Sequence, residues 1–357
     1  MYMKLTKLLT VLFAFVLLFN ISCSSDSNEI EIPPITYQNG YFIPNEGNFN
    51  SNGANVMFLT RDLTLKQDDI YGFNNKTGNN NEILGDVLQT IAINEKYAYL
   101  VINNSNKIVV VDRITFKKVA VITEQLNNPR GIAFANGFIY VSNTNFTTGK
   151  YSVTKYKISD FSFVSKIDFT EVADRIVEAG GNVFVQNASS GFGNKITYIN
   201  TSNDAKTEIP IPNGQIGRTV SYNSDVYTIS GTSTDSYIYK ISSTGAVSPV
   251  ITLTGIANGT NLQVDNGKFY FSSGNKIYTT SVTTPIVPAN SLITVADNSP
   301  SYFVLYGFSV VDGRIFTSNV KEFKANSEMT VYSAASGAKI SSFNTGGLGA
   351  NGAVLNP

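Results

Sequence analysis

The sequence predicts an all-β fold built from repeated four-stranded units, and three observations support this class. The apolar residues lie in short runs of β-branched and aromatic side chains bounded by Gly, Asn, Asp or Ser, which is typical of strands and turns. Sustained helical periodicity is missing after the N-terminal segment. The runs recur with a period of about 43 residues, which indicates a repeat architecture. Units of this kind are the blades of a β-propeller, whereas a β-sandwich would leave the regular period unexplained.

The sequence contains seven such units, of which the earliest is incomplete. The unit 88–122 contains the runs TIAI, YAYLVINN, KIVVVD and KKVAVI, and the unit 129–167 repeats this pattern. The earliest unit contains YFIPN at 41–45 but lacks a first strand, which residues 349–355 can supply. We therefore expect a seven-bladed β-propeller whose closing blade is shared between the N- and C-terminal ends. The remaining units begin near Asp174, Gly217, Asn261 and Gly307.

The composition excludes several classes of function. Among 357 residues, 26 Lys and Arg balance 26 Asp and Glu, and this zero net charge disfavours a general nucleic-acid binder. The absence of histidine removes the commonest general base and the commonest zinc ligand. The one cysteine, Cys23, excludes internal disulfides and thiolate metal sites. We therefore expect a non-catalytic protein without a metal or a resident cofactor.

The N-terminal segment is typical of a secretory signal. Lys4 and Lys7 precede the apolar run 8–19, which is short for a membrane span. Cys23 follows shortly after this run and resembles the lipidated cysteine of a bacterial lipobox. Asn20 departs from that pattern, because Leu or Val is usual at its position. The alternative is a cleaved signal peptide with an incidental cysteine.

The residues after the cysteine extend this interpretation. SSDSNE at 24–29 is polar and acidic, and it resembles the signal that sends lipoproteins of Bacteroidetes-type bacteria to the outer face of the outer membrane. The expected organisation is a lipoprotein signal peptide at 1–22, a lipidated tether at 23–36 and the β-propeller at 37–357.

Several motifs resemble those of a known propeller family. YVSN at 140–143 is close to the YVTN signature of YncE-like, YVTN-repeat propellers. IVVVD at 108–112, followed by Thr115 and Lys117, is similar to the hairpin between their third and fourth strands. YFIPNEG at 41–47 resembles the opening of a narrower group, the propeller lipoproteins of Bacteroidetes that partner TonB-dependent outer-membrane transporters.

This resemblance implies a function and a partner. The protein would be a surface-exposed lipoprotein, held at the outer membrane by its lipid anchor, that captures a small molecule and passes it to a TonB-dependent transporter. The best understood members of the group capture cobalamin (vitamin B12), so the implied ligand is a corrinoid. Without histidine, no imidazole can replace the axial ligand of cobalt, and binding would rest on the corrin periphery and the nucleotide tail.

Two other classes of function stay open. One is an adhesion or scaffold propeller that binds a glycan or a protein through the same face. The other is a lyase or lactonase that uses a carboxylate-bound metal. Calcium is conceivable at an acidic cluster in the first unit, but the spacing matches no calcium loop and favours a solvated acidic face. The acids of this cluster are Asp62, Asp68, Asp69, Glu82 and Asp86.

Loops that follow the second strands open on one face of a propeller, around the central channel. Those expected at 45–54, 143–150, 187–194 and 319–327 are longer than a hairpin needs, and each carries a phenylalanine. An aromatic ring on a polar loop suits a flat ligand that covers it, although each ring could instead fold back over its own blade. The four rings are Phe49, Phe146, Phe192 and Phe323.

Asparagines end or follow most of the second strands and could bond the amide edges of a ligand. Asparagine also favours turns for purely local reasons, because its side chain bonds nearby backbone groups. The candidates are Asn45, Asn103, Asn104, Asn143, Asn187 and Asn319.

Arginines recur at the entry to the first strand in three successive units, and they are Arg130, Arg175 and Arg218. Their guanidinium groups could grip a phosphate or carboxylate in bidentate geometry. The alternative is bonding between blades, to carbonyls or to the carboxylates Glu171, Asp174 and Glu178.

Overall fold

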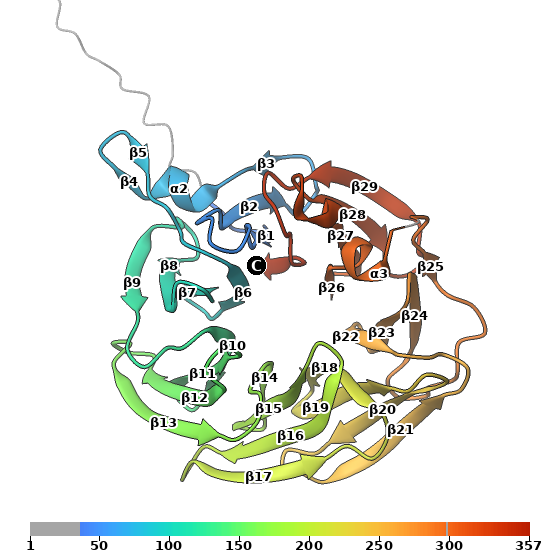
Figure 1. Cartoon of the computed structure of the whole chain (residues 1–357). Helices are drawn as coiled ribbons and strands as arrows, with labels where there is room; N and C mark the ends of the chain where they lie inside the picture. The colour runs from blue at the N-terminus through green and yellow to red at the C-terminus, as the bar shows by residue number, and fades with distance from the viewer. Residues whose placement is uncertain (1–35, 298) are drawn as a thin grey trace, which may run out of the picture. The chain divides into compact units, whose positions relative to one another are not determined.

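The computed structural model describes residues 36–297 and 299–357, which belong to one compact unit, Thr36–Pro357. The expected signal peptide, Cys23 and all but the last residue of the expected tether lie outside the described residues. Within the unit, seven four-stranded antiparallel sheets follow one another around a common centre (Figure 1). The predicted all-β, seven-bladed β-propeller is therefore confirmed.

The blades are numbered here in chain order, and in each the innermost strand is given first. Blade 1 contains β30 (Val354–Asn356), β1 (Gly40–Asn45), β2 (Asn55–Thr60) and β3 (Lys66–Gln67). Blade 2 contains β6 (Leu88–Ile93), β7 (Tyr97–Ile102), β8 (Lys107–Asp112) and β9 (Lys118–Ile122). Blade 3 contains β10 (Pro129–Ala135), β11 (Phe138–Asn145), β12 (Lys150–Lys157) and β13 (Phe163–Phe169). Blade 4 contains β14 (Ile176–Ala179), β15 (Asn182–Ser189), β16 (Phe192–Asn200) and β17 (Ala205–Pro210).

The last three blades have the same order. Blade 5 contains β18 (Gln215–Tyr222), β19 (Asp225–Gly231), β20 (Ser236–Ile241) and β21 (Val247–Leu253). Blade 6 contains β22 (Thr260–Asp265), β23 (Lys268–Ser273), β24 (Lys276–Ser281) and β25 (Ile293–Thr294). Blade 7 contains β26 (Gly307–Val311), β27 (Arg314–Asn319), β28 (Glu328–Ser333) and β29 (Lys339–Asn344).

Short elements are inserted between these strands. Between blades 1 and 2 lie α2 (Ile70–Asn74) and a hairpin of β4 (Lys76–Thr77) and β5 (Asn80–Asn81). The helix α3 (Ser301–Val304) precedes blade 7, and the 3₁₀ turn η1 (Lys321–Phe323) connects β27 to β28.

Blade 1 is completed by the end of the chain, as the incomplete first unit predicted. Strand β30 pairs antiparallel with β1, from Gly40 opposite Asn356 to Phe42 opposite Val354. A separate bridge joins Asn45 to Ala350. The C-terminus accordingly lies beside β1 near the centre of the ring (Figure 1).

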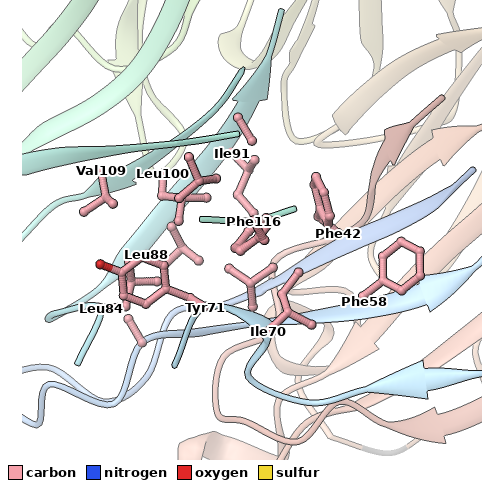
Figure 2. Close-up of a cluster of buried hydrophobic side chains, with 14 of the residues drawn as sticks. Phe42, Phe58, Ile70, Tyr71, Leu84, Leu88, Ile91, Leu100, Val109 and Phe116 are labelled. Carbon is pink, nitrogen blue, oxygen red and sulfur yellow. The ribbon is translucent and has the colours of Figure 1, made fainter. Parts of the chain in front are cut away.

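The core is divided among the interfaces between neighbouring blades. Successive side chains of a strand point to opposite faces, and here both faces are covered by another blade. In β1, Tyr41 and Ile43 pack with Phe316 of blade 7, whereas Phe42 packs with Leu100 of blade 2. Figure 2 shows the second of these clusters, in which aromatic rings of blade 1 meet aliphatic side chains of blade 2. This two-sided burial explains why the strands are apolar throughout.

The tip of blade 4 differs from the sequence prediction. A long loop was expected at 187–194, but β15 and β16 continue to a two-residue turn, Ser190-Gly191. Both turn residues have positive φ, 52° and 79°, which matches the twist of a tight hairpin. Phe192 is therefore the first residue of β16, not a loop tip. The loop expected at 143–150 is likewise shortened, to 146–149.

Candidate functional site

Two connected cavities lie along the centre of the propeller. The mouth cavity, of about 590 Å³, is bordered by loops of blades 1, 2, 3 and 7 and includes Phe49, Phe146 and Phe323. The channel cavity, of about 350 Å³, is lined by inner strands and by the residues that lead into them. Gln89 and Arg130 border both cavities, so the mouth leads into the channel.

Phe49 is held at the mouth by a network of polar side chains. The ring is 66% exposed and lies on the loop between β1 and β2. The backbone N–H of the next residue, Asn50, donates to Asp86 Oδ2 over 2.8 Å. Asn104 donates to the same carboxylate and to Asn50 Oδ1, the latter over 3.1 Å. Asn104, predicted as a ligand contact, thus anchors the loop that carries Phe49.

Phe146 and Phe323 reach the mouth from blades 3 and 7. Phe146 is 59% exposed at the start of the loop from β11 to β12. Phe323 is half-buried and makes an edge-to-face contact with Tyr306, with ring centroids 5.1 Å apart. It follows Lys321 and Glu322 in a run of three non-glycine residues with positive φ. This backbone conformation is costly for L-residues, and packing of the Phe323 ring offsets part of that cost.

Glu46 is a buried carboxylate at the mouth that the sequence analysis missed. Its Oε2 accepts a hydrogen bond from Tyr306 Oη over 2.6 Å, and its Oε1 accepts one from Asn351 Nδ2 over 2.7 Å. Burial raises the pKa of Glu46 to about 7, against the opposing effects of these hydrogen bonds and of the Arg130 charge. Near neutral pH this carboxylate therefore exchanges its proton and can either accept or donate a hydrogen bond.

Asn45 and Asn143 lie inside their blades, with no accessible surface. Asn45 Nδ2 donates to Asn55 Oδ1 and to Thr345 O, each over 2.8 Å. Asn143 Nδ2 donates to Val141 O over 3.0 Å, and its Oδ1 accepts from a backbone N–H. Neither side chain can reach a ligand in this structure, and each has the structural role that asparagine at a strand end commonly has.

The other predicted asparagines also have protein partners. Asn187 donates to Val172 O over 2.8 Å, and Asn319 donates to Asp297 Oδ2 over 2.9 Å. Asn103 donates to a backbone carbonyl but borders the mouth cavity, so it is the one member of the set that lies beside the hollow.

Phe192 is not brought to the cavities. Its ring is 79% exposed on blade 4, and it lines neither the mouth nor the channel. The tight Ser190-Gly191 hairpin keeps Phe192 in the strand ladder, opposite Ser189.

The three predicted arginines line the channel cavity together. Arg130 is the extra residue of a β-bulge in β10, since Pro129 pairs with Asn143 and Gly131 with Ser142. Bulges re-aim side chains, and this one directs Arg130 to the junction of the two cavities. Arg175 immediately precedes β14, and Arg218 lies within β18.

The charges of the arginines affect one another. Burial lowers the pKa of Arg175, an effect that Asp174 opposes and Arg130 reinforces. Burial also lowers the pKa of Arg218, with Arg175 adding to it. Protein atoms surround the hollow, but the Arg175 side chain that lines it is exposed to water.

The acidic cluster of the first unit is dispersed over separate local roles. Asp69 caps α2 by accepting from the Gly72 N–H, and Glu82 is paired with Lys118. In residues 36–297 and 299–357, no group of three or more His, Cys, Asp and Glu side chains is placed to hold a metal ion.

The helices of the described residues are all too short or too polar to cross a membrane.

Solved structures share this architecture at low sequence identity. A protein of Bacteroides thetaiotaomicron described as quinonprotein alcohol dehydrogenase-like aligns with 90% of this chain and 79% of its own, at 16% identity and a TM-score of 0.68. A functionally unknown protein from Desulfotomaculum acetoxidans aligns with 89% of this chain and 99% of its own, at 12% identity and a TM-score of 0.64. The β-propeller domain of Cps50 (Swd1) from Myceliophteria thermophila aligns with 75% of this chain and 89% of its own, at 10% identity and a TM-score of 0.57. These likenesses define the class: this chain is a β-propeller.

The family is more specific than the class. Residues 39–347 match the family described as a domain of unknown function, DUF5074, and the chain belongs to that family. The match includes Glu46, the phenylalanines of the mouth and the arginines of the channel, and it ends before β30. No curated protein matches the sequence.

Proposed function

We propose that this protein is a non-catalytic capture protein that holds a small molecule at the mouth cavity and passes it to an outer-membrane transporter. The observation that carries the proposal is the pair of exposed rings, Phe49 and Phe146, at the rim of a hollow that continues inward. Exposed rings on polar loops cost solubility unless a ligand or partner covers them. A hollow of this depth supports a small molecule over a broad protein or glycan surface.

The chemistry of the mouth suits a flat ligand with a polar edge. Phe49, Phe146 and Phe323 offer apolar faces from three blades, while Asn103 and the Glu46 carboxyl supply hydrogen-bonding groups nearby. A corrinoid such as cobalamin, the ligand implied by the resemblance at 41–47, has a flat macrocycle and amide side chains. We propose that the macrocycle lies across the mouth and stacks on the exposed rings.

The N-terminal segment supports a location for this activity. The resemblance to a lipobox at Cys23, followed by the acidic stretch 24–29, supports a lipid anchor in the outer membrane with the propeller at the cell surface. A tether of this kind raises the effective concentration of the loaded protein near a TonB-dependent transporter, which favours hand-off over diffusion.

The test is a titration of cyanocobalamin into the soluble chain that starts at Ser24. This chain retains the whole compact unit Thr36–Pro357. We expect one-to-one binding by calorimetry and a shift of the corrin absorption band. Replacing Phe146 by Ala is expected to weaken binding about tenfold or more, as for a buried aromatic anchor.

Phe192→Ala is the matched control, because it removes a ring that is even more exposed than Phe146 but lines neither cavity. Its affinity is expected to equal that of the wild type. Absence of binding at high micromolar cyanocobalamin would reject the corrinoid. Equal losses for the two variants would reject the mouth as the binding site.

A further inference from the structure

The channel cavity carries an excess of positive charge. Among the described residues that line it, three are positively charged, Arg130, Arg175 and Arg218, and only Asp174 is negatively charged. These side chains come from blades 3, 4 and 5, which are neighbours in the ring, so the excess lies on one side of the channel. An anion of one or two charges would balance it.

The carboxylate of Asp174 is already used by Arg130. Arg130 Nε donates to Asp174 Oδ1 over 2.9 Å, and Arg130 Nη1 donates to Gln89 Oε1 over 2.8 Å. The two charged side chains are only 22% and 16% exposed, so the pair is partly shielded from solvent. Arg130 therefore has its charge balanced within the protein.

Arg218 is bonded to neutral acceptors. Its Nη1 donates to the Phe308 carbonyl oxygen over 3.2 Å. The amide oxygen of Gln263, in the orientation that satisfies both groups, accepts from the same nitrogen over 3.1 Å. The charged group that acts on Arg218 is Arg175, which repels it. These bonds hold the guanidinium in place without neutralising it.

Arg175 has no hydrogen-bond acceptor among residues 36–297 and 299–357, and its guanidinium faces the channel cavity. A guanidinium carries five N–H donors in a planar fork. The guanidinium is exposed to the water of the cavity, and an anion that accepts from the fork would replace that water with a charge-assisted pair. Within the described residues, Arg175 is thus a donor without an acceptor, beside a second arginine, Arg218, that has no ion-pair partner.

We propose that the channel is a binding site for a small oxyanion, a phosphate or carboxylate group, held by Arg175 and Arg218. Planar guanidinium forks match such groups in bidentate geometry. A cavity of about 350 Å³ accommodates a phosphate together with water. The site goes beyond the capture of a ligand at the mouth and does not depend on it, because these two arginines border the channel alone. Since the cavities meet at Arg130, the oxyanion is either a free anion or an arm of the molecule at the mouth.

The test is a calorimetric titration of inorganic phosphate, and separately of acetate, into the soluble chain that starts at Ser24, in chloride buffer near neutral pH. We expect one-to-one binding of phosphate. Arg175→Gln is expected to weaken it at least about tenfold, the loss typical of one charge-assisted hydrogen bond. Lys117→Gln, which removes an exposed charge from a turn of blade 2, is expected to bind phosphate as the wild type does.

Folding of the variant does not limit this test. In the described part of the chain Arg175 has no side-chain partner to leave unpaired, so Arg175→Gln should melt at or above the wild-type temperature when no anion is present. Phosphate should then raise the melting temperature of the wild type but not that of the variant. Arg218→Gln is the second variant, with the same expected loss of phosphate affinity.

Further arms separate the two sources of the oxyanion. If the oxyanion is a free anion, Phe146→Ala should weaken binding of the mouth ligand but leave phosphate binding unchanged. If the oxyanion is an arm of the mouth ligand, Arg175→Gln should weaken binding of cyanocobalamin, which has a phosphodiester. It should not weaken binding of cobinamide, which lacks that group. If Arg175→Gln and Arg218→Gln both bind every probe as the wild type does, or if no probe binds or stabilises the wild type, the oxyanion site is rejected. If cyanocobalamin alone fails to bind, only the corrinoid is rejected as the mouth ligand, and the result with phosphate is unaffected.

Discussion

Blade 1 and blade 3 share the same antiparallel order but are assembled in different ways. In blade 3, the inner strand β10 pairs with β11 along its whole length, from Pro129 to Ala135, apart from the bulge at Arg130. In blade 1, the inner strand β30 arrives from the other end of the chain and pairs only with Gly40–Phe42. A short pairing without a connecting turn gives fewer ladder hydrogen bonds, so the closing blade needs other contacts.

Buried polar side chains supply those contacts in blade 1. Asn356 Nδ2 donates to the Tyr37 and Arg113 carbonyl oxygens, over 2.6 and 2.9 Å, and Arg113 Nη1 donates back to Asn356 Oδ1 over 2.7 Å. At the other end of β1, Asn351 Nδ2 donates to Glu46. Each such bond contributes about 1 kcal/mol, so a few of them replace part of the missing ladder. The comparison shows that ring closure here adds buried side-chain hydrogen bonds to a shorter strand ladder and a few further backbone bonds.

The largest effect is expected for Asn356→Ala. It leaves buried carbonyls of Tyr37 and Arg113 without a donor, so we expect a loss of about 2–3 kcal/mol in urea unfolding. Amide exchange in β1 should also accelerate, because β30 would detach more often. Asn143→Ala is the matched variant in blade 3, with an equally buried asparagine. It should also destabilise, but exchange in β1 should stay at the wild-type rate. Identical exchange in the two variants would contradict the special role of side chains in closure.

A pH-dependent effect is expected from Glu46, which bonds the C-terminal segment. Because its pKa rises from 4.5 to about 7 on folding, the folded state holds the proton more tightly than the unfolded state. The resulting stability is fully present below pH 4.5 and is lost as the pH rises through 7. The loss is at most about 3 kcal/mol. Glu46→Gln, which has no proton to lose, should flatten this part of the stability curve.

The measurement is urea unfolding at several pH values across this window. Glu95→Gln is the control, because it removes an exposed carboxylate from blade 2 and should leave the slope unchanged. A wild-type stability that rises over the same window would contradict the burial of Glu46 as its cause.

The smallest effect is expected for Arg61→Gln. Arg61 Nε donates to Asp312 Oδ2 over 2.7 Å, which links a turn of blade 1 to a turn of blade 7 on the closing interface. The arginine is 48% exposed, so solvent and salt weaken the pair. We expect little change in the thermal midpoint at physiological salt and a small decrease at low salt. A loss as large as that of Asn356→Ala would show that surface pairs, not buried side chains, maintain closure.

The fold was predictable from the sequence because its signals are local and repeated. Runs such as YAYLVI at 97–102 are apolar on both faces, and the repeat period sets the architecture. The incomplete unit at 41–45 predicted closure, and β30 supplies the missing strand. Only its position differed, since the strand spans Val354–Asn356 and not the whole of 349–355.

The candidate site was predictable only in part. An asparagine that follows a strand looks the same in the sequence whether it contacts a ligand or bonds the protein itself. Asn143 bonds the protein and is buried within its blade. Phe192 was predicted on a long loop because the residues around it are polar and small. In the structure Ser190-Gly191 forms a tight turn, and Phe192 belongs to a strand. Glu46 gave no signal, since its burial depends on Tyr306 and Asn351, which are distant in sequence. The unbalanced charge at Arg175 likewise appears only when three blades meet around one channel.

The hydrogen bond from Asn356 to Tyr37 has a consequence for the order of the blades in the chain. It places the two ends of the propeller side by side, so the described chain from Tyr37 to Asn356 is already close to a closed ring. A peptide link between these ends, with a new opening cut in an exposed turn such as the one that contains Glu95, would give a circular permutant with the same seven blades. In that permutant blade 1 would be continuous and blade 2 would be the blade shared between the ends. The number of blades is therefore a property of the fold, whereas the choice of the blade that is divided is a property of where the chain happens to be open.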